Sequence, residues 1–449
     1  MTIEGLEIPL CRAPVRGSIR PPGSKSITNR ALVCAALARG TTTLTGALDS
    51  QDTRVMVDGL ATLGIGVEPD WKGATIVVRG AGGSIPSSQA TLDCAASGTT
   101  IRFLAAVCSL GDGAYRLDGT PRMRKRPIGD LLEALRALGV EASAESPGGC
   151  PPVAIRSGGM PGGATTVRGG TSSQFASALA MVAPCTPLGM AIDFEGRLVS
   201  LPYLEMTRRV MADFGAACNV DGPARWSIPA GHYIGRDYAI EPDASAASYF
   251  LAAAAITGGS VRVDGLSRRS MQGDVDFALA LEAMGCGVHW HEDPHTPAAD
   301  SVTVSGRASR GIDIDMNAIS DTVPTLGVVA LFADGPTTIR NVAHIRDKET
   351  DRIGDLGREL SRLGARIEER ADGLTIHPAP LSAAALATYD DHRMAMSLAL
   401  AGLRVPGVRI LDPRCTGKTF PGYWQSLAGI VPFSPDSLDA ASWPAEFRP

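Results

Sequence analysis

Two short segments bring together charged and hydroxyl side chains of the kinds that bind anions. In the first, PPGSKSITNR, a Pro-Gly turn precedes Lys25, Ser26 and Arg30, and an apolar run follows over residues 31–38. Unpaired N–H groups at a helix N-terminus, together with the positive end of the helix dipole, attract anions. We therefore expect a helix that begins near Lys25 and binds a phosphate or carboxylate. Taken alone, the segment equally fits a capped surface helix whose Lys and Arg are solvated.

The second segment is RDKETDR, at residues 346–352. Lys348 and Arg352 are four residues apart and would share one face of a helix, where two like charges repel each other unless an anion lies between them. Glu349 stands beside them in the sequence. This pattern predicts a phosphate or carboxylate clamp with an acid or base next to it. The simpler interpretation is that Glu349 only bridges the two cations.

Similar residue types recur in segments whose signal is weaker. PRMRKRP places four cations within five positions, beginning at Arg122. Ser172, Ser173 and Gln174 follow a pair of glycines, and residues 391–393 read Asp-His-Arg. Each segment also has an ordinary interpretation, respectively a solvated basic loop, a serine N-cap and a histidine at a helix start. These segments support an anion site only if the fold brings them together.

The elements that position these residues form a repeat. Six units share small polar residues, an Ala-rich helix, a Gly turn and a β-branched strand, followed by a second helix and further strand-like segments. The second helices end, at intervals of roughly 70–80 residues, in glycine stops at Gly64, Gly139, Gly215, Gly285 and Gly364. We predict an α/β protein with six βαβαββ units in two groups of three. One domain would span residues 24–240, and the other residues 1–23 and 241–449.

The candidate residues occupy the same place in nearly every unit, the start of a helix. Surface solvation does not explain such regularity, whereas converging helix starts would form one chamber rich in cations and N–H donors. The sequence therefore predicts a site for anionic substrates that is shared between the two domains. The segment from about 434 to 449 has little periodicity and adds nothing to this pattern.

Composition excludes several other classes of protein. A net charge of −5 disfavours nucleic acid and anionic membranes as partners, so any anion site must be local. The nine cysteines form no C-x-x-C pair, and no leader or membrane-length apolar run is present, so we expect a cytoplasmic protein with reduced thiols. The sequence GSKS at Gly23 lacks the spacing of a nucleotide P-loop. His289, His291 and His295 fall on one strand and its turn with no matching ligand, so we expect no metal there.

Assembled, these stretches closely resemble the EPSP synthase family, the 3-phosphoshikimate 1-carboxyvinyltransferases. The resemblance runs from about Pro14 to about Ala428 and rests on PPGSKSITNRAL, SGTTIRFLAA, GTPRMRKRPIGDL, SSQFASAL, VSLPYLEMT, DASAASYFLAAAAI, SMQGD, RDKETDR, DDHRMAM and CTGKTFPGYW. It implies the enolpyruvyl transferase fold, an inside-out α/β barrel in two domains that close over phosphoenolpyruvate and shikimate 3-phosphate. It also implies that no metal or organic cofactor takes part, and we expect a monomer.

The resemblance further implies roles for individual residues. Asp321 would be the base near the attacking 5-hydroxyl and Glu349 the acid that protonates the methylene carbon, with Lys25 as an alternative proton carrier. The residues implied for shikimate 3-phosphate are Lys25, Ser26, Arg30, Ser172, Ser173, Gln174, Ser200, Tyr203, Asp321, His344 and Lys348. Those implied for phosphoenolpyruvate are Lys25, Gly98, Arg122, Gln174, Arg352, Arg393 and Lys418.

Three positions depart from the family pattern, and two alternative functions stay open. Ala96 and His344 stand where the family usually or often has Asn, and Phe103 replaces a frequent Pro or Leu. Because Gly98 carries no methyl group, we predict inhibition by glyphosate in competition with phosphoenolpyruvate.

One alternative, a UDP-N-acetylglucosamine enolpyruvyl transferase, would have a catalytic Cys in the PRMRKRP segment, where none occurs. The other, a non-catalytic binder of phosphorylated metabolites, does not explain two carboxylates in a cationic chamber.

Overall fold

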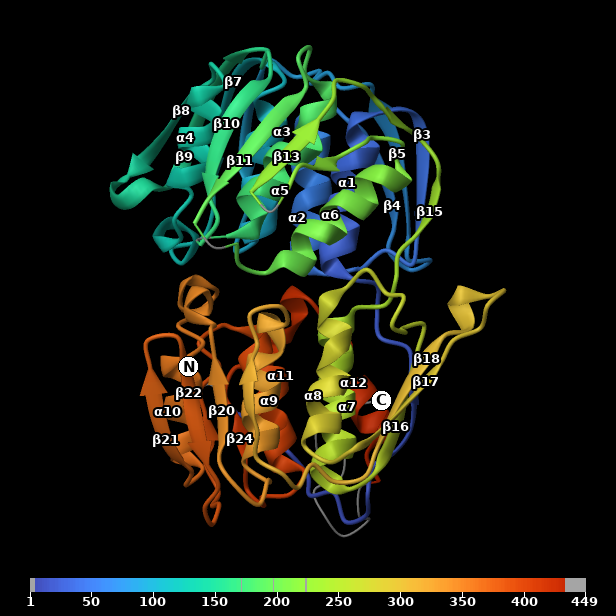
Figure 1. Cartoon of the computed structure of the whole chain (residues 1–449), viewed down its shortest axis with the longest axis vertical. Helices are drawn as coiled ribbons and strands as arrows, with labels where there is room; N and C mark the ends of the chain where they lie inside the picture. Colours follow the sequence, from blue (N-terminus) through green and yellow to red (C-terminus); the bar gives the residue numbers. More distant parts are fainter. Residues whose placement is uncertain (1–4, 171, 197, 223, 433–449) are drawn as a thin grey trace. The chain divides into compact units, whose positions relative to one another are not determined.

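The computed structural model describes residues 5–170, 172–196, 198–222 and 224–432, so the segment 434–449 lies outside the described residues (Figure 1). The chain folds into two compact units. The inserted unit is Gly23–Glu241, and the terminal unit combines Met1–Pro22 with Pro242–Pro449. Each contains three sheets and three copies of one repeat.

The repeat is clearest in the second copy, which follows the predicted βαβαββ order. Strand β6 (Gln89–Asp93) pairs in parallel with β7 (Asp112–Asp118), and helix α3 (Gly98–Cys108) connects them. Two parallel neighbouring strands need such a crossover, because the chain must return to the starting edge of the sheet before the second strand begins, and a short turn cannot span that distance. Helix α4 (Gly129–Ala137) then leads to an antiparallel hairpin of β8 (Glu141–Ser146) and β9 (Cys150–Gly158), which gives the sheet order β6-β7-β9-β8. The predicted fold class is confirmed.

In the inserted unit, the first strand of the first copy comes from the far end of the unit. Strands β14 (Tyr233–Ile234) and β15 (Asp237–Ala239) pair in parallel with β3 (Ala38–Thr45) and close the unit on itself. Its remaining elements, in chain order, are α1 (Lys25–Leu37), β3 (Ala38–Thr45), α2 (Gln51–Thr62), β4 (Gly66–Asp70), β5 (Thr75–Ala81), η1 (Met123–Lys125), β8 (Glu141–Ser146), η2 (Pro147–Gly149), β9 (Cys150–Gly158), β10 (Gly163–Arg168), α5 (Ser173–Val182), η3 (Ala183–Cys185), β11 (Met190–Glu195), α6 (Leu201–Asp213), β12 (Asn219–Val220), β13 (Arg225–Ile228), β14 (Tyr233–Ile234) and β15 (Asp237–Ala239).

The terminal unit is completed in the same way by the start of the chain. Strand β2 (Arg16–Ile19) pairs in parallel with β16 (Ser260–Asp264), and β1 (Leu6–Glu7) pairs in antiparallel with β24 (Arg409–Ile410). The other elements are α7 (Ala244–Thr257), β16 (Ser260–Asp264), η4 (Gly273–Asp276), α8 (Phe277–Ala283), β17 (Gly287–His291), η5 (Pro297–Ala299), β18 (Ser301–Ser305), β19 (Asp313–Asp315), η6 (Ser320–Thr322), α9 (Val323–Ala330), β20 (Thr337–Arg340), η7 (Ala343–Asp347), α10 (Gly354–Arg362), β21 (Arg366–Arg370), β22 (Gly373–His377), β23 (Ala385–Leu386), α11 (His392–Gly402), β24 (Arg409–Ile410), η8 (Pro413–Lys418) and α12 (Tyr423–Ile430).

The first helix of each copy lies in the interior of its unit, and the sheets lie outside. In α7 every residue from Ala244 to Thr257 is buried, and in α3 every residue from Gly98 to Cys108. Helices α1, α3 and α5 pack against one another in the inserted unit, as α7, α9 and α11 do in the terminal unit (Figure 1). Such helices are apolar on all sides because no face meets water. Strands such as β11 alternate between buried and partly exposed residues, as expected for a sheet with one outer face.

Local signals in the sequence set where these helices begin and end. Five of the six first helices have a side chain that caps the N-terminus, at Ser24, Ser97, Ser172, Asp243 and Asp391. The five predicted glycine stops all have positive φ, from 85° to 111°, which only Gly adopts without cost. Helix starts that carry polar side chains follow directly from this capping chemistry.

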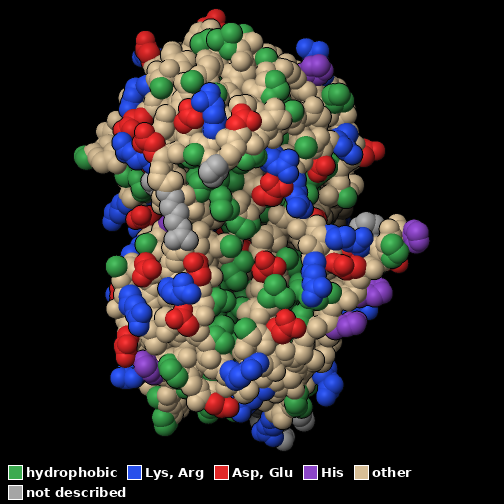
Figure 2. Space-filling model, viewed as in Figure 1, with side chains coloured by type: hydrophobic (Ala, Val, Ile, Leu, Met, Phe, Trp, Pro, Cys, Tyr) green, Lys and Arg blue, Asp and Glu red, His purple; other side chains and the backbone are tan. Residues whose placement is uncertain are grey.

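The surface agrees with the modest net charge. On the face shown in Figure 2, acidic and basic side chains are interspersed over both units, and no extended basic patch is presented there. Among the helices of the described part, none combines the length and the apolar composition needed to cross a membrane.

Candidate active site

A buried arginine organises the charged residues of the terminal unit. Arg352, with 1% of its side chain exposed, donates through Nε and Nη2 to the two oxygens of Asp391, at 2.7 and 3.1 Å. Its Nη1 reaches Asp321 Oδ1 at 3.2 Å and its Nη2 reaches Glu349 Oε2 at 2.8 Å. Burial by itself would lower the pKa of Arg352, but the surrounding carboxylates outweigh it and raise the pKa above its ordinary value. Arg352 is therefore a permanent cation shared by three carboxylates.

The segment around Arg352 is not helical, so the prediction that Lys348 and Arg352 share a helical face is wrong. Helix η7 ends at Asp347 and α10 begins at Gly354, so Lys348 and Arg352 do not share a helical face. Asp351 is responsible, because its Oδ1 accepts from the N–H groups of Ile353 and Gly354 and so starts α10 after Arg352. The two cations are nevertheless brought together, since both approach Asp321 Oδ1, Lys348 Nζ at 3.8 Å and Arg352 at 3.2 Å.

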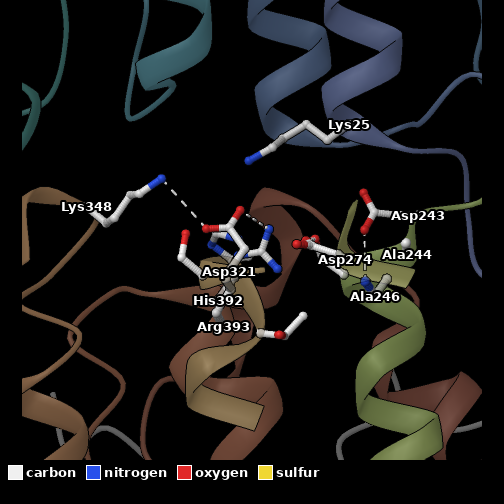
Figure 3. Close-up of polar contacts among 12 residues, drawn as sticks. Lys25, Asp243, Ala244, Ala246, Asp274, Asp321, Lys348, His392 and Arg393 are labelled. Atoms are coloured by element: carbon white, nitrogen blue, oxygen red, sulfur yellow. Dashed lines mark hydrogen bonds and ion pairs between the residues drawn. The ribbon is translucent and has the colours of Figure 1, made fainter. Parts of the chain in front are cut away.

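Asp321 has cations on both of its oxygens. It lies in η6, in front of α9, and its Oδ2 accepts from Arg393 Nη2 at 2.8 Å, while Lys348 and Arg352 approach the other oxygen (Figure 3). The carboxylate keeps 14% of its side-chain surface exposed. A carboxylate that is fixed by cations and still reachable from solvent meets the geometric needs of a general base.

Glu349 is held in a similar way by two other cations. Its Oε2 accepts from Arg352 and its Oε1 from Lys418 Nζ, at 3.0 Å, and 12% of its side chain is exposed. The simpler interpretation of RDKETDR is thus partly confirmed, because Glu349 does bridge cations, Arg352 of the same segment and Lys418 of a distant one. We call these seven residues the ion cluster: Asp321, Lys348, Glu349, Arg352, Asp391, Arg393 and Lys418.

His344 lies next to this cluster in its neutral form. Its Nε2 is 3.0 Å from Ser320 Oγ, on the element that carries Asp321. Burial lowers the pKa of His344 to about 4, and the nearby Lys348 lowers it further than Asp321 raises it. At neutral pH the imidazole therefore contributes hydrogen bonding and no charge.

This shift predicts a pH effect on stability. Between the ordinary pKa of 6.5 and the folded value of about 4, the unfolded chain binds a proton at His344 that the folded chain does not. The free energy of unfolding must then fall as the pH is lowered through this window. We expect the wild type to lose roughly 2–3 kcal/mol more than His344→Asn between pH 7 and pH 4. Urea unfolding across this pH range tests it, and parallel pH profiles for both proteins would contradict it.

Asp274 and Asp391 are carboxylates that lie near the predicted catalytic and substrate-binding residues without belonging to either set. Asp391 caps α11 by accepting from Arg393 N at 2.8 Å while it binds Arg352. Asp274 accepts from Ser245 Oγ and lies beside Asp321 and Arg393 (Figure 3). Burial raises the pKa of Asp274 to about 7, with help from Asp321 and against the effect of Arg393. Asp391 belongs to DDHRMAM and Asp274 to SMQGD, two of the segments that carry the family resemblance. The residues that each carboxylate contacts come from other segments, so the sequence did not indicate them.

In the inserted unit, the predicted helix at Lys25 is confirmed and its cation is paired. Helix α1 begins at Lys25 after the cap Ser24, whose Oγ accepts from Ile27 N. Lys25 Nζ lies 3.3 Å from Asp52 Oδ2, and 13% of the Lys25 side chain is exposed, against 3% for Asp52. Asp52 stands in the first turn of α2 and was not predicted. It orients the Lys25 amine while leaving part of it accessible.

Arg30 is a buried cation bound to neutral oxygens. Its Nε donates to Thr207 Oγ1 at 2.7 Å and its Nη1 to Ser26 O at 2.9 Å, and the guanidinium lies 5.4 Å from the Phe103 ring centroid. Arg30 is 1% exposed, and none of the described carboxylates forms an ion pair with it. Burial lowers its pKa to about 10. An anionic group brought within reach would relieve this desolvation.

Gln174 is held by residues that were not assigned to the site. Its Oε1 accepts from Arg102 Nη1, and its Nε2 donates to Thr99 Oγ1 at 3.4 Å. Arg102 itself stacks 5.1 Å from the Phe175 ring centroid. Because α3 packs against α5, this network fixes the start of α5 relative to α3.

The remaining predicted residues of this unit also lie at helix starts. Ser172 caps α5 by accepting from Gln174 N at 3.2 Å, and Ser173 is the first residue of that helix. Ser200 precedes α6 with a left-handed φ of 55°. Gly98 opens α3, Arg122 precedes η1, and Tyr203 lies in the first turn of α6.

Comparison with known proteins agrees on one family. The sequence profile of EPSP synthase (3-phosphoshikimate 1-carboxyvinyltransferase) matches residues 11–427. The 3-phosphoshikimate 1-carboxyvinyltransferase of Nostoc punctiforme is 47% identical over 424 residues, which covers 94% of this chain and 98% of that protein. The enzyme of the same name from Shewanella oneidensis is 45% identical, with 93% and 97% covered. The chain belongs to the EPSP synthase family.

Solved structures support the fold of this EPSP synthase family member. EPSP synthase from Acinetobacter baumannii matches with a TM-score of 0.79 at 23% identity, covering 95% of this chain and 98% of that one. The enolpyruvyl transferase NikO from Streptomyces tendae matches with a TM-score of 0.72 at 20% identity, with 95% and 97% covered. Both show the enolpyruvyl transferase fold that the resemblance implied.

The three histidines of the β17 region lie on the strand and in the turn that follows it. His289 and His291 are exposed on β17, and His295 lies in the turn beyond it. No three His, Cys, Asp or Glu side chains within the described ranges are grouped as metal ligands.

Proposed function

We propose that this member of the EPSP synthase family transfers the carboxyvinyl group of phosphoenolpyruvate to the 5-hydroxyl of shikimate 3-phosphate. The single observation that carries the proposal is the ion cluster, in which two partly exposed carboxylates, Asp321 and Glu349, are each fixed by cations. Such an arrangement provides proton transfer together with charge for two anionic substrates. The reaction yields 5-enolpyruvylshikimate 3-phosphate and phosphate, a step in aromatic amino acid biosynthesis.

The chemistry proceeds by addition and then elimination. The hydroxyl oxygen bonds to C2 of phosphoenolpyruvate while Asp321 accepts the hydroxyl proton and Glu349 gives a proton to C3. In the resulting tetrahedral intermediate, C3 then returns a proton and the C2–O bond to phosphate breaks. Positive charge develops at C2 during both steps, so nearby carboxylates also stabilise the transition state. Lys25, paired with Asp52, is the alternative proton carrier.

The other predicted residues bind and orient the substrates. Ser172, Ser173 and Ser200 hold the shikimate phosphate with Lys348, while Ser26 and Arg30 hold the carboxylate. Gln174 and Tyr203 line the ring, and His344 lies near the phosphate. Phosphoenolpyruvate is bound by Lys25, Gly98, Arg122, Gln174, Arg352, Arg393 and Lys418. Fixing two reactants in this way supplies much of the rate enhancement.

The deciding experiment measures phosphate release from phosphoenolpyruvate with either shikimate 3-phosphate or UDP-N-acetylglucosamine as co-substrate. We expect turnover only with the first, unchanged by EDTA, from a protein that elutes as a monomer. Lys25→Ala should abolish it, whereas Arg54→Ala, which removes an exposed cation 2.7 Å from Asp49, should not. Turnover with UDP-N-acetylglucosamine, or full activity in Lys25→Ala, would overturn the proposal.

Inhibition by glyphosate depends on the space at Gly98. A methyl group there would lie 2.7 Å from both Nη1 and Nη2 of Arg126, a side chain that is 4% exposed, so the guanidinium would have to move. We expect competitive inhibition of the wild type against phosphoenolpyruvate. In Gly98→Ala, the KM for phosphoenolpyruvate and the inhibition constant should each rise about 10-fold or more.

Gly429→Ala is the matched control for this substitution, because an added methyl group at that helical position meets nothing within 4 Å. It should leave both constants unchanged. Initial rates at varied phosphoenolpyruvate and glyphosate give both constants. Wild-type turnover that is insensitive to millimolar glyphosate would contradict this prediction.

A further inference from the structure

The helix start that carries Asp391 and Arg393 follows a strained stretch of backbone. Tyr389 and Asp390 both have φ of 56°, the left-handed region that side chains other than Gly rarely adopt. Two such residues in succession cost conformational free energy and persist only where the surroundings hold them. Directly after them, Asp391 caps α11 and binds Arg352, and Arg393 reaches Asp321. The position of these side chains therefore depends on what holds residues 387–390.

Residues 387–390 are held in place by a buried carboxylate on α10. Glu359, with 0% of its side chain exposed, accepts from Tyr389 Oη through Oε1 at 2.6 Å and from Ala387 N through Oε2 at 2.9 Å. Arg362 Nη1, 3.3 Å from Oε2, supplies the compensating charge and also donates to Ala385 O. Both oxygens of Glu359 are thus committed to this segment.

The Tyr389 ring is fixed from a second side. The guanidinium of Arg358 lies 5.7 Å from the ring centroid, and its Nη1 is 3.1 Å from the hydroxyl. Burial raises the pKa of Tyr389, as does the hydrogen bond to Glu359, so the hydroxyl stays protonated and donates at neutral pH. Helix α10 therefore contacts the segment with Glu359 and Arg358, and the turn before it supplies Arg352 to the next residue, Asp391.

We propose that Glu359 and Tyr389 are a positioning pair, which holds the left-handed turn so that Asp391 and Arg393 meet Arg352 and Asp321 in the geometry that binds and converts phosphoenolpyruvate. Neither residue touches substrate. The inference rests on the proposed function for its effect on turnover. Its structural part, the ordering of the α11 start, is independent of any activity.

The test compares two Tyr→Phe substitutions that act on the same helix. Tyr389→Phe removes the hydroxyl that binds Glu359, whereas Tyr423→Phe removes a buried hydroxyl that donates to Met396 O of α11 at 2.7 Å. We expect Tyr389→Phe to lower kcat/KM for phosphoenolpyruvate about 10- to 100-fold, because small displacements of positioned groups cost that much. Tyr423→Phe should stay within about twofold of wild type at a similar loss of thermal stability. Equal kinetic effects of the two substitutions would overturn the proposal.

Two further measurements test the proposal without relying on the turnover assay alone or on the Tyr389→Phe variant alone. Amide hydrogen exchange in the peptide covering residues 387–396 should accelerate in Tyr389→Phe and not in Tyr423→Phe, whether or not the protein turns over these substrates. Wild-type protein without turnover but with this exchange pattern would contradict the proposed function and support the positioning pair. In a double-mutant cycle, Glu359→Gln and Tyr389→Phe should be strongly non-additive in kcat/KM, because an amide cannot accept at both positions. Additive effects, or unchanged exchange in Tyr389→Phe, would overturn it.

Discussion

Asp321→Asn is expected to lower kcat by about 10²- to 10⁴-fold with shikimate 3-phosphate and phosphoenolpyruvate, the range measured for loss of a general acid or base. Asparagine keeps the size of the side chain but cannot accept the hydroxyl proton. The fold should survive, because Arg352 retains Asp391 and Glu349 as partners. Steady-state phosphate release measures kcat, and the folded state is checked by urea unfolding.

Asp313→Asn provides the matched control for this prediction. Asp313 lies on β19 of the same unit and forms an ion pair with Arg340 at 2.7 Å, with 66% of its side chain exposed. Its replacement should leave kcat unchanged. If Asp321→Asn kept more than about a tenth of wild-type kcat, the assignment of Asp321 as general base would fall.

Arg352→Met is expected to lower the free energy of unfolding by roughly 3–5 kcal/mol and to abolish turnover. The substitution leaves the fully buried Asp391, and to a lesser extent Glu349 and Asp321, without the cation that compensates them. Removing one partner of a buried ion pair is costly because the remaining charge stays desolvated. Denaturant unfolding at neutral pH gives the stability difference, and phosphate release gives the activity.

The control for Arg352→Met is an arginine of the same unit at the surface. Arg340, with 49% of its side chain exposed, pairs with Asp313, and Arg340→Met should leave both the free energy of unfolding and turnover close to wild type. Similar losses of stability in the two variants would show that Arg352 does not organise the ion cluster. Retained turnover in Arg352→Met would remove it from the set that binds phosphoenolpyruvate.

Much of the fold was predictable because its signals are local. The repeat was found from Ala-rich helices and glycine stops, and these stops adopt the positive φ that other residues avoid. The helix starts followed from capping residues such as Ser24 and Asp391. A side chain that caps its own helix bonds to an N–H group two or three positions away, so the sequence indicates it directly.

The same local reasoning failed where a turn replaced a helix. The spacing predicts Lys348 and Arg352 on one helical face, but Asp351 Oδ1 accepts from Ile353 N and Gly354 N in a turn, and α10 begins only after that turn, at Gly354. The two side chains are nevertheless close together, because both approach Asp321, which belongs to a segment distant in the sequence. The pattern of two cations four residues apart therefore correctly indicated that Lys348 and Arg352 lie close together. The reason it implied, a shared helical face, is wrong.

The sequence by itself determined the repeat, the helix starts, the candidate residues and, through the resemblance, the family. Only the tertiary structure decided which carboxylate meets which cation: Asp52 with Lys25, Asp391 with Arg352, and Lys418 with Glu349. It also decided that strand β2 completes the sheet of β16, and that Glu359 holds the turn at Tyr389. These contacts join residues 27 to 244 positions apart. Each depends on how the buried helices pack, and local capping and periodicity carry no information about such partners.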